Sequence, residues 1–174
     1  GVRQIIGAAA VAQAAEVAER GEALQRLLVL RRGRLVPGRE AESEAGRAYL
    51  IVRALRNAQG EWHERCRLFR ETLEHPDSEL RRRLASRYNL DWLNPEDFLF
   101  CDLETTGLMT GTVFLIGTMA WEDEGFVVRQ RFARHYGEER AILSLFRDYA
   151  AGRIVFVSFN GKTFDLPFLR TRVA

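Results

Sequence analysis

Three short apolar segments in the second half of the chain constrain the fold more than any other feature of the sequence. They cover residues 98–103, 112–121 and 125–132. Turn-forming residues separate them, "TTG" before the second segment and "EDEG" before the third. Strands joined by such short connections pair in antiparallel order. The sequence therefore predicts a three-stranded antiparallel meander.

The residues after the meander change to a helical period. A predicted helix, "EERAILSLFRDYAAG", stops at Gly152. Its apolar stripe consists of Ile142, Leu145, Phe146 and Tyr149. The run "RIVFVSF" then predicts a buried strand, and "TFDLPFLRTRV" predicts the start of another helix. The order β-β-β-α-β-α predicts an α/β fold in which a mixed sheet has helices on its faces.

The sequence predicts two regions. Residues 1–94 form a mainly helical region, and residues 95–174 form the α/β domain. Helices are expected over residues 8–30 and 61–74, and a third begins after Ser78, a favoured N-cap residue.

Two segments between these helices are not predicted as helical. Arg31–Glu40 is a basic, turn-rich connection with Gly33, Pro37 and Gly38 as breakers. Residues 47–55 are compatible with a strand or a helix, and the strand is favoured because Tyr49, Ile51 and Val52 have high β-propensity.

Composition excludes several classes of protein. Hydrophobic residues make up 47% of the 174 residues, which is enough for a core. No uninterrupted apolar run is long enough to cross a membrane. Cys66 and Cys101 cannot build a disulfide framework, so reduced thiols and a cytoplasmic location are expected. The net charge of +2 does not by itself indicate a nucleic-acid-binding protein.

Two carboxylates lie at the end of the first predicted strand of the meander. Asp102 and Glu104 are two positions apart, so on a strand they project from the same face. Adjacent anions repel unless a cation lies between them, and a hard divalent ion suits carboxylate ligands. Asp165, at the start of a later helix, is a third candidate ligand. The alternative is a solvated pair at a strand end, which is the commoner meaning of an isolated Asp-x-Glu.

Two motifs together resemble a known family. "DLETTGL" (102–108) and "SFNGKTFDLPFL" (158–169) resemble the first and second exonuclease motifs of the DEDD branch of the RNase H-like superfamily. The likeness is strongest to the YprB-like RNase H-like domain family, in which a Phe-Leu-Ile-Gly strand, here Phe114–Gly117, lies between the motifs. The resemblance covers about residues 95–174 and implies an RNase H-like mixed sheet.

The same resemblance implies a two-metal exonuclease. Asp102, Glu104 and Asp165 would hold two Mg²⁺ or Mn²⁺ ions, one activating a water and the other stabilising the leaving 3′ oxygen. The implied reaction is 3′–5′ hydrolysis of a single-stranded DNA or RNA end. The oligomeric state stays open.

Further residues of the two motifs would contact the substrate: Thr105, Thr106, Gly107, Leu108, Asn160 and Phe164. Three of these residues also have a simpler interpretation that needs no substrate. Gly107 is also an ordinary turn residue, Asn160 suits an Asx turn, and Phe164 suits core packing.

A complete site of this kind also takes a fourth carboxylate, with a His or Tyr a few residues before it as general base. No such motif follows Asp165 before Ala174. We therefore expect a C-terminally truncated fragment that lacks the last strand and helix of the fold and degrades nucleic acid poorly.

Two other functions fit the sequence. One is a non-catalytic nucleic-acid-binding module, in which arginines of the basic first half contact phosphate. Those arginines are Arg31, Arg32, Arg34 and Arg81–Arg83. The other is the proofreading exonuclease domain of a larger polymerase.

Overall fold

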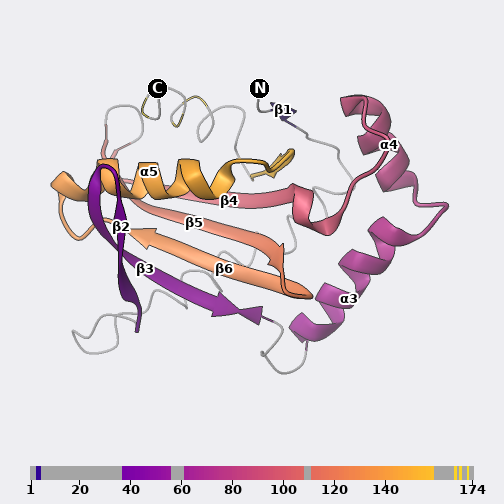
Figure 1. Cartoon of the computed structure of the whole chain (residues 1–174), viewed down its shortest axis with the longest axis horizontal. Helices are drawn as coiled ribbons and strands as arrows, with labels where there is room; N and C mark the ends of the chain where they lie inside the picture. Colours follow the sequence, from indigo (N-terminus) through magenta and orange to yellow (C-terminus); the bar gives the residue numbers. More distant parts are fainter. Residues whose placement is uncertain are drawn as a thin grey trace.

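A mixed seven-stranded sheet forms the centre of the described molecule (Figure 1). The structure is a computed structural model, and it describes residues 3–4, 37–55, 61–107 and 111–158, together with residues 167, 169 and 172. The strand order is β1-β7-β4-β5-β6-β3-β2. The strands are β1 (Arg3–Gln4), β2 (Arg39–Ser43), β3 (Gly46–Ala54), β4 (Phe98–Thr105), β5 (Val113–Glu122), β6 (Gly125–Phe132) and β7 (Val155–Val157).

The predicted antiparallel meander is confirmed as β4, β5 and β6. Asp123 and Glu124, which join β5 to β6, have φ angles of 44° and 66°. Positive φ at both central residues is typical of the tight turn whose twist matches that of the two strands it joins. The register is regular along β4 until a shift between Glu104 and Thr105.

The strand predicted over residues 47–55 is confirmed as β3, which pairs with β6 and brings a hairpin from the first half of the chain into the sheet. Its partner β2 differs from the prediction, in which Arg39 and Glu40 belong to a turn-rich connection. Ala41 is the one buried residue of β2, so this strand lacks the apolar alternation of a typical strand. The division of the chain between residues 94 and 95 stays a prediction.

Helix α5 (Glu139–Ala150) and strand β7 follow the meander as predicted. Gly152, the predicted stop, has a φ of 84° just after the helix. β7 pairs in parallel with β4, Phe100 lying opposite Val157. β7 and β4 therefore point towards the same end of the sheet. The last residue of β7 pairs with Phe100, which precedes Asp102 on β4.

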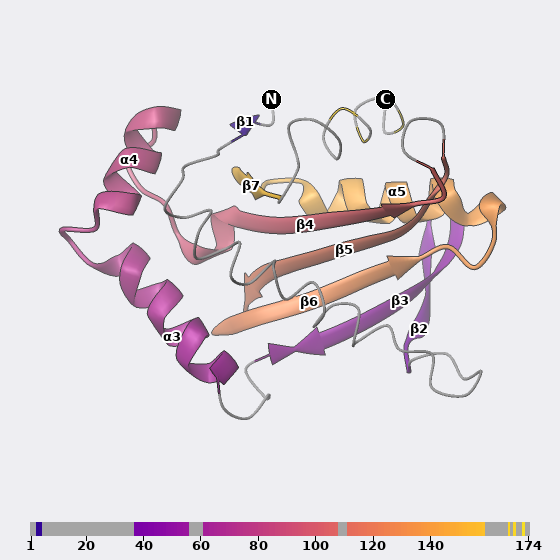
Figure 2. The ribbon, with the colours of Figure 1, turned by 180° about the vertical axis from the view of Figure 1, so that it is seen from behind.

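The two faces of the sheet are covered differently. Helix α5 contacts one face, where its Ile142 and Phe146 share a buried cluster with Leu99 and Cys101 of β4. On the opposite face, Phe69 of α3 (Glu61–Glu74) packs among aromatic residues of the sheet: Phe98, Phe100, Trp121 and Phe126. β4 begins beside α3 and ends at the other end of the sheet, where α5 begins (Figure 2).

The helix predicted after Ser78 is confirmed as α4 (Glu79–Tyr88), with the Ser78 side chain accepting a hydrogen bond from the backbone N–H of Arg81 at 3.2 Å. Two short 3-10 turns, Pro95–Asp97 and Tyr136–Glu138, precede β4 and α5. Cys66 and Cys101 are both buried, and neither forms a disulfide. Among the described helices, none is both long and apolar enough to cross a membrane.

Several predictions concern residues outside those that the structure describes. They are the helix over residues 8–30 and four of the proposed site residues, Leu108, Asn160, Phe164 and Asp165.

Candidate active site

Strand β4 places Asp102 and Glu104 on the same face of the sheet. Residues Leu99, Cys101 and Leu103 belong to the core beneath α5, so the residues between them point to the opposite face. The register shift lies after Glu104 and does not separate the two carboxylates. Asp102 is exposed and Glu104 is half-buried. The two carboxylates can therefore meet a ligand from solvent.

The position beside Asp102 on the neighbouring strand has no side chain. Gly117 of β5 pairs with Asp102. A Cβ built on Gly117 would have one neighbour within 4 Å, the Asp102 carbonyl oxygen at 3.7 Å, which is an ordinary contact. Among the described residues, no contact requires glycine here, although Gly117 is buried. The glycine adds no side chain beside the adjacent carboxylate.

The turn after β4 is closed by threonine hydrogen bonds. The Thr106 backbone N–H donates to the Thr112 carbonyl at 3.0 Å, and the Thr112 N–H donates to Thr106 Oγ1 at 2.9 Å. The Thr105 hydroxyl donates to the Gly107 carbonyl at 2.9 Å. Since Thr106 Oγ1 acts as an acceptor within the turn, its own O–H can still donate to a ligand, whereas that of Thr105 is already used.

Close packing in this turn requires glycine at position 111 and not at position 107. A Cβ on Gly111 would lie closer to the Gly107 nitrogen than any real contact allows. A Cβ on Gly107 would lie 3.7 Å from its nearest neighbour. Gly107 is exposed, so an approaching ligand could reach its backbone. The sequence motif points to Gly107 and gives no sign of the part that Gly111 plays.

Glu139 and Arg172 connect this turn to two helical segments, and neither residue was singled out from the sequence. Glu139 Oε1 accepts hydrogen bonds from the Val113 backbone N–H at 2.9 Å and from Arg172 Nη1 at 2.7 Å. Arg172 Nη2 donates to the Gly111 carbonyl at 2.8 Å. The pair is separated by 33 positions in the sequence, and no local pattern reveals it.

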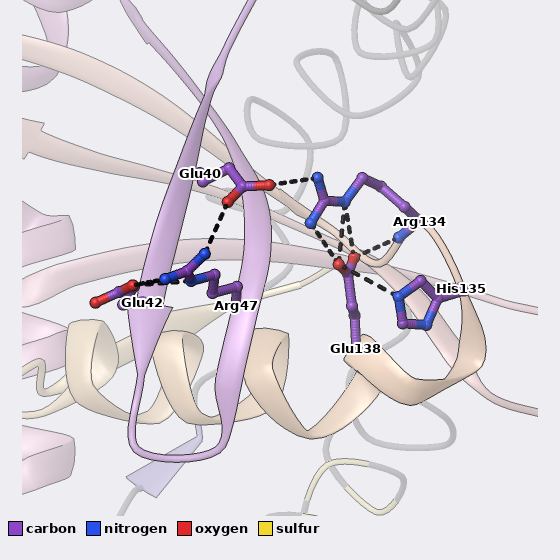
Figure 3. Close-up of polar contacts among 6 residues, drawn as sticks. All are labelled: Glu40, Glu42, Arg47, Arg134, His135 and Glu138. Atoms are coloured by element: carbon purple, nitrogen blue, oxygen red, sulfur yellow. Dashed lines mark hydrogen bonds and ion pairs between the residues drawn. The ribbon is translucent and has the colours of Figure 1, made fainter.

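The start of α5 is held by a second polar network (Figure 3). Arg134 donates to Glu138 through its backbone N–H at 2.8 Å and its Nε at 3.0 Å, and to Glu40 of β2 at 2.7 Å. The Arg134 guanidinium holds the pKa of the Glu138 carboxyl below its ordinary value. This network joins the β2–β3 hairpin to the residue that immediately precedes Glu139.

The described residues contain part of the predicted metal site. Asp102 and Glu104 are brought together, and two carboxylates on one face suit a hard divalent cation. Asp165 lies outside the described residues, and within the described ranges no group of three or more His, Cys, Asp or Glu side chains is placed to hold a metal. Because β7 pairs in parallel with β4, β7 points towards the same end of the sheet as the Asp102 and Glu104 end of β4.

Comparison with known proteins identifies the same part of the chain. No curated protein and no solved structure matches the sequence. A family model described as RNase H superfamily matches residues 99–174, which is less than half of the chain. The match begins in β4 and contains both carboxylates of the candidate site, and the mixed α/β sheet is consistent with an RNase H-like fold. From residue 99 onward, the chain is therefore similar to the RNase H superfamily.

Proposed function

We propose that this chain carries a metal-dependent nuclease domain of the YprB-like kind, which hydrolyses phosphodiester bonds at the 3′ end of single-stranded DNA or RNA. One observation carries the proposal. Asp102 and Glu104 lie on one face at the end of β4, inside the stretch that matches the RNase H superfamily. The likeness of both motifs to DEDD exonucleases supports the finer assignment.

Different residues of the chain would bind the metal ions and the substrate. Asp102, Glu104 and Asp165 would hold Mg²⁺ or Mn²⁺, two ions in a complete site. When bound, such ions activate water and stabilise a leaving oxygen. The exposed Thr106 hydroxyl would donate to the terminal phosphate or sugar, and the Gly107 backbone would allow close approach. Leu108, Asn160 and Phe164 would complete the contacts by analogy with the family's motifs.

The arginines of α4 give less support to a non-catalytic binding module. Arg81 stacks over the Trp92 ring at 4.2 Å and donates to the Pro76 carbonyl at 2.9 Å. Arg83 forms an ion pair with Glu79 at 2.5 Å. Because these guanidinium groups have partners within the protein, binding of phosphate would have to replace those contacts. The binding module therefore has less support than the nuclease.

The test uses the full 174-residue chain and a single-stranded oligonucleotide labelled at either end. We expect the 174 residues to bind the oligonucleotide with Mg²⁺ or Mn²⁺ and to shorten it slowly from its 3′ end, because Asp102, Glu104 and Asp165 are three of the four carboxylates that the resemblance implies. Asp102→Asn should reduce metal-dependent binding and abolish shortening. Asp91→Asn, the same chemical change at an exposed position outside both motifs, serves as the matched control.

The outcomes separate the candidate functions. Metal-independent binding that Asp102→Asn leaves unchanged would indicate a binding module and contradict the nuclease. Shortening from the 5′ end would contradict the assigned polarity. The presence of polymerase motifs elsewhere in the gene would instead favour the proofreading domain.

A further inference from the structure

Two charged side chains hold together three segments that are far apart in the sequence. Glu139 is the first residue of α5, and its side chain is 18% exposed. Arg172, with a side chain 26% exposed, belongs to the part of the chain that follows the second motif. Together they contact Gly111 and Val113, which follow the turn after β4. We call these two residues the Glu139–Arg172 clamp.

Glu139 satisfies a backbone group that the sheet leaves without a ladder partner. Val113 is fully buried and pairs with Thr105 beyond the register shift of β4. A buried backbone N–H must find an acceptor, and the Glu139 carboxylate provides it. A carboxylate in the first turn of a helix is also favoured by the helix dipole. Glu139 therefore fixes where β5 begins relative to α5.

Arg172 uses both terminal nitrogens of its planar guanidinium. One donates to Glu139 and the other to the Gly111 carbonyl, so the fork spans the carboxylate and the turn at once. A lysine ammonium has no such fixed fork. Leu169, three positions earlier, is 5% exposed and lies in the core cluster with Leu99. The segment that carries Arg172 is thus anchored in the core.

The clamp joins the turn of the first motif to the segment that follows the second motif. Its turn follows directly on Asp102, Glu104 and Thr106 of the first motif. In the sequence, Arg172 lies seven positions after Asp165 of the second motif. We infer that Glu139 and Arg172 are positioning residues that set the first-motif turn against the segment bearing the second motif. For its role in substrate binding, the inference rests on the proposed function.

Hydrogen exchange measured by mass spectrometry tests the positioning without any ligand. Arg172→Gln and Glu139→Gln should each speed exchange about tenfold or more in peptides containing residues 105–107 and 111–113. Exchange in β3 and β6 should change little. Arg147→Gln is the matched control, since Arg147 also joins α5 to another segment, through Glu44 at 2.6 Å, but away from the turn.

Two exchange results would overturn the inference. One is unchanged exchange around the turn in both variants. The other is an equal loss of protection in β3 and in the turn, which would show a general loss of stability rather than local positioning. Arg172→Lys adds a further check, because lysine keeps the positive charge but lacks the forked guanidinium. Exchange around the turn in this variant should resemble that in Arg172→Gln.

Oligonucleotide binding distinguishes positioning from direct contact. If the clamp positions the turn, both Glu139→Gln and Arg172→Gln should weaken binding of a single-stranded oligonucleotide several-fold in Mg²⁺. If Arg172 instead binds phosphate itself, Glu139→Gln removes a competing carboxylate and should strengthen binding, which would contradict the inference. Failure of the unaltered chain to bind would count against the proposed function, while the exchange experiment would still decide whether the clamp positions the turn.

Discussion

At the scale of single residues, the candidate site depends as much on side chains that are absent as on those that are present. Gly117 adds no side chain beside Asp102, and Gly111 allows the chain to cross Gly107 at a distance that excludes a Cβ. Of these two glycines, only Gly111 is required by packing against the residues that the structure describes. Gly117 is itself buried, and no contact with a described residue requires glycine there.

The two glycines of the turn should therefore respond differently to substitution. Gly111→Ala would force a Cβ against the Gly107 backbone, and overpacking of this kind lowers the free energy of unfolding by about 1–3 kcal/mol. Gly107→Ala is the control, because its nearest neighbour would be 3.7 Å away. Urea denaturation of both variants measures the difference. Equal losses of stability would show that the close approach is not what selects glycine at position 111.

At the scale of elements, ion pairs attach the β2–β3 hairpin and α5 to the turn that follows β6. Arg134 contacts both Glu40 of β2 and the buried Glu138 before α5 (Figure 3). The outer strand β2 buries only Ala41, so these polar contacts supplement a weak apolar contribution. Charged residues along such an edge also oppose pairing with a second chain.

The Glu138 pair predicts a dependence of stability on pH. Because Arg134 lowers the pKa of Glu138 in the folded state, the pair stabilises the fold above the ordinary carboxyl pKa. That stabilisation is lost as the pH falls through the lowered value. Glu138→Gln should thus reduce the free energy of unfolding by about 1–3 kcal/mol at pH 7. The difference from the unaltered protein should shrink on acidification.

Denaturation curves at several pH values, with Glu42→Gln as an exposed control, check this prediction. Glu42 pairs with Arg47 in solvent, where such pairs contribute little. A difference between Glu138→Gln and the unaltered protein that grows towards low pH would contradict the predicted direction of the effect.

At the scale of the whole molecule, the sequence predicts those elements that carry their own pattern. The meander, α5 and β7 each combine an apolar run with a clear turn signal, and all three are confirmed. β2 was missed because its pairing with β3 and its ion pairs, rather than its own residues, make it a strand. The Glu139–Arg172 clamp was missed for the same reason, since its partners meet only after folding.

The arrangement of the candidate site could be predicted only in part. The placement of Asp102 and Glu104 on one face follows from strand geometry alone. Their relation to the turn could not be foreseen, because it depends on a register shift, a close crossing at Gly111 and a salt bridge across 33 positions. Asp165 stays a predicted ligand.

Binding of Mn²⁺ to the full chain tests the central claim most directly. Electron paramagnetic resonance of free Mn²⁺ during a titration counts the ions bound to the unaltered protein, to Asp102→Asn, to Glu104→Gln and to Asp165→Asn. Asp91→Asn serves as the control. We predict saturable binding that each of the first three substitutions weakens by tenfold or more and that Asp91→Asn leaves unchanged. Binding that is equal in all five proteins, or absent from the unaltered chain, would contradict a metal site built on these carboxylates.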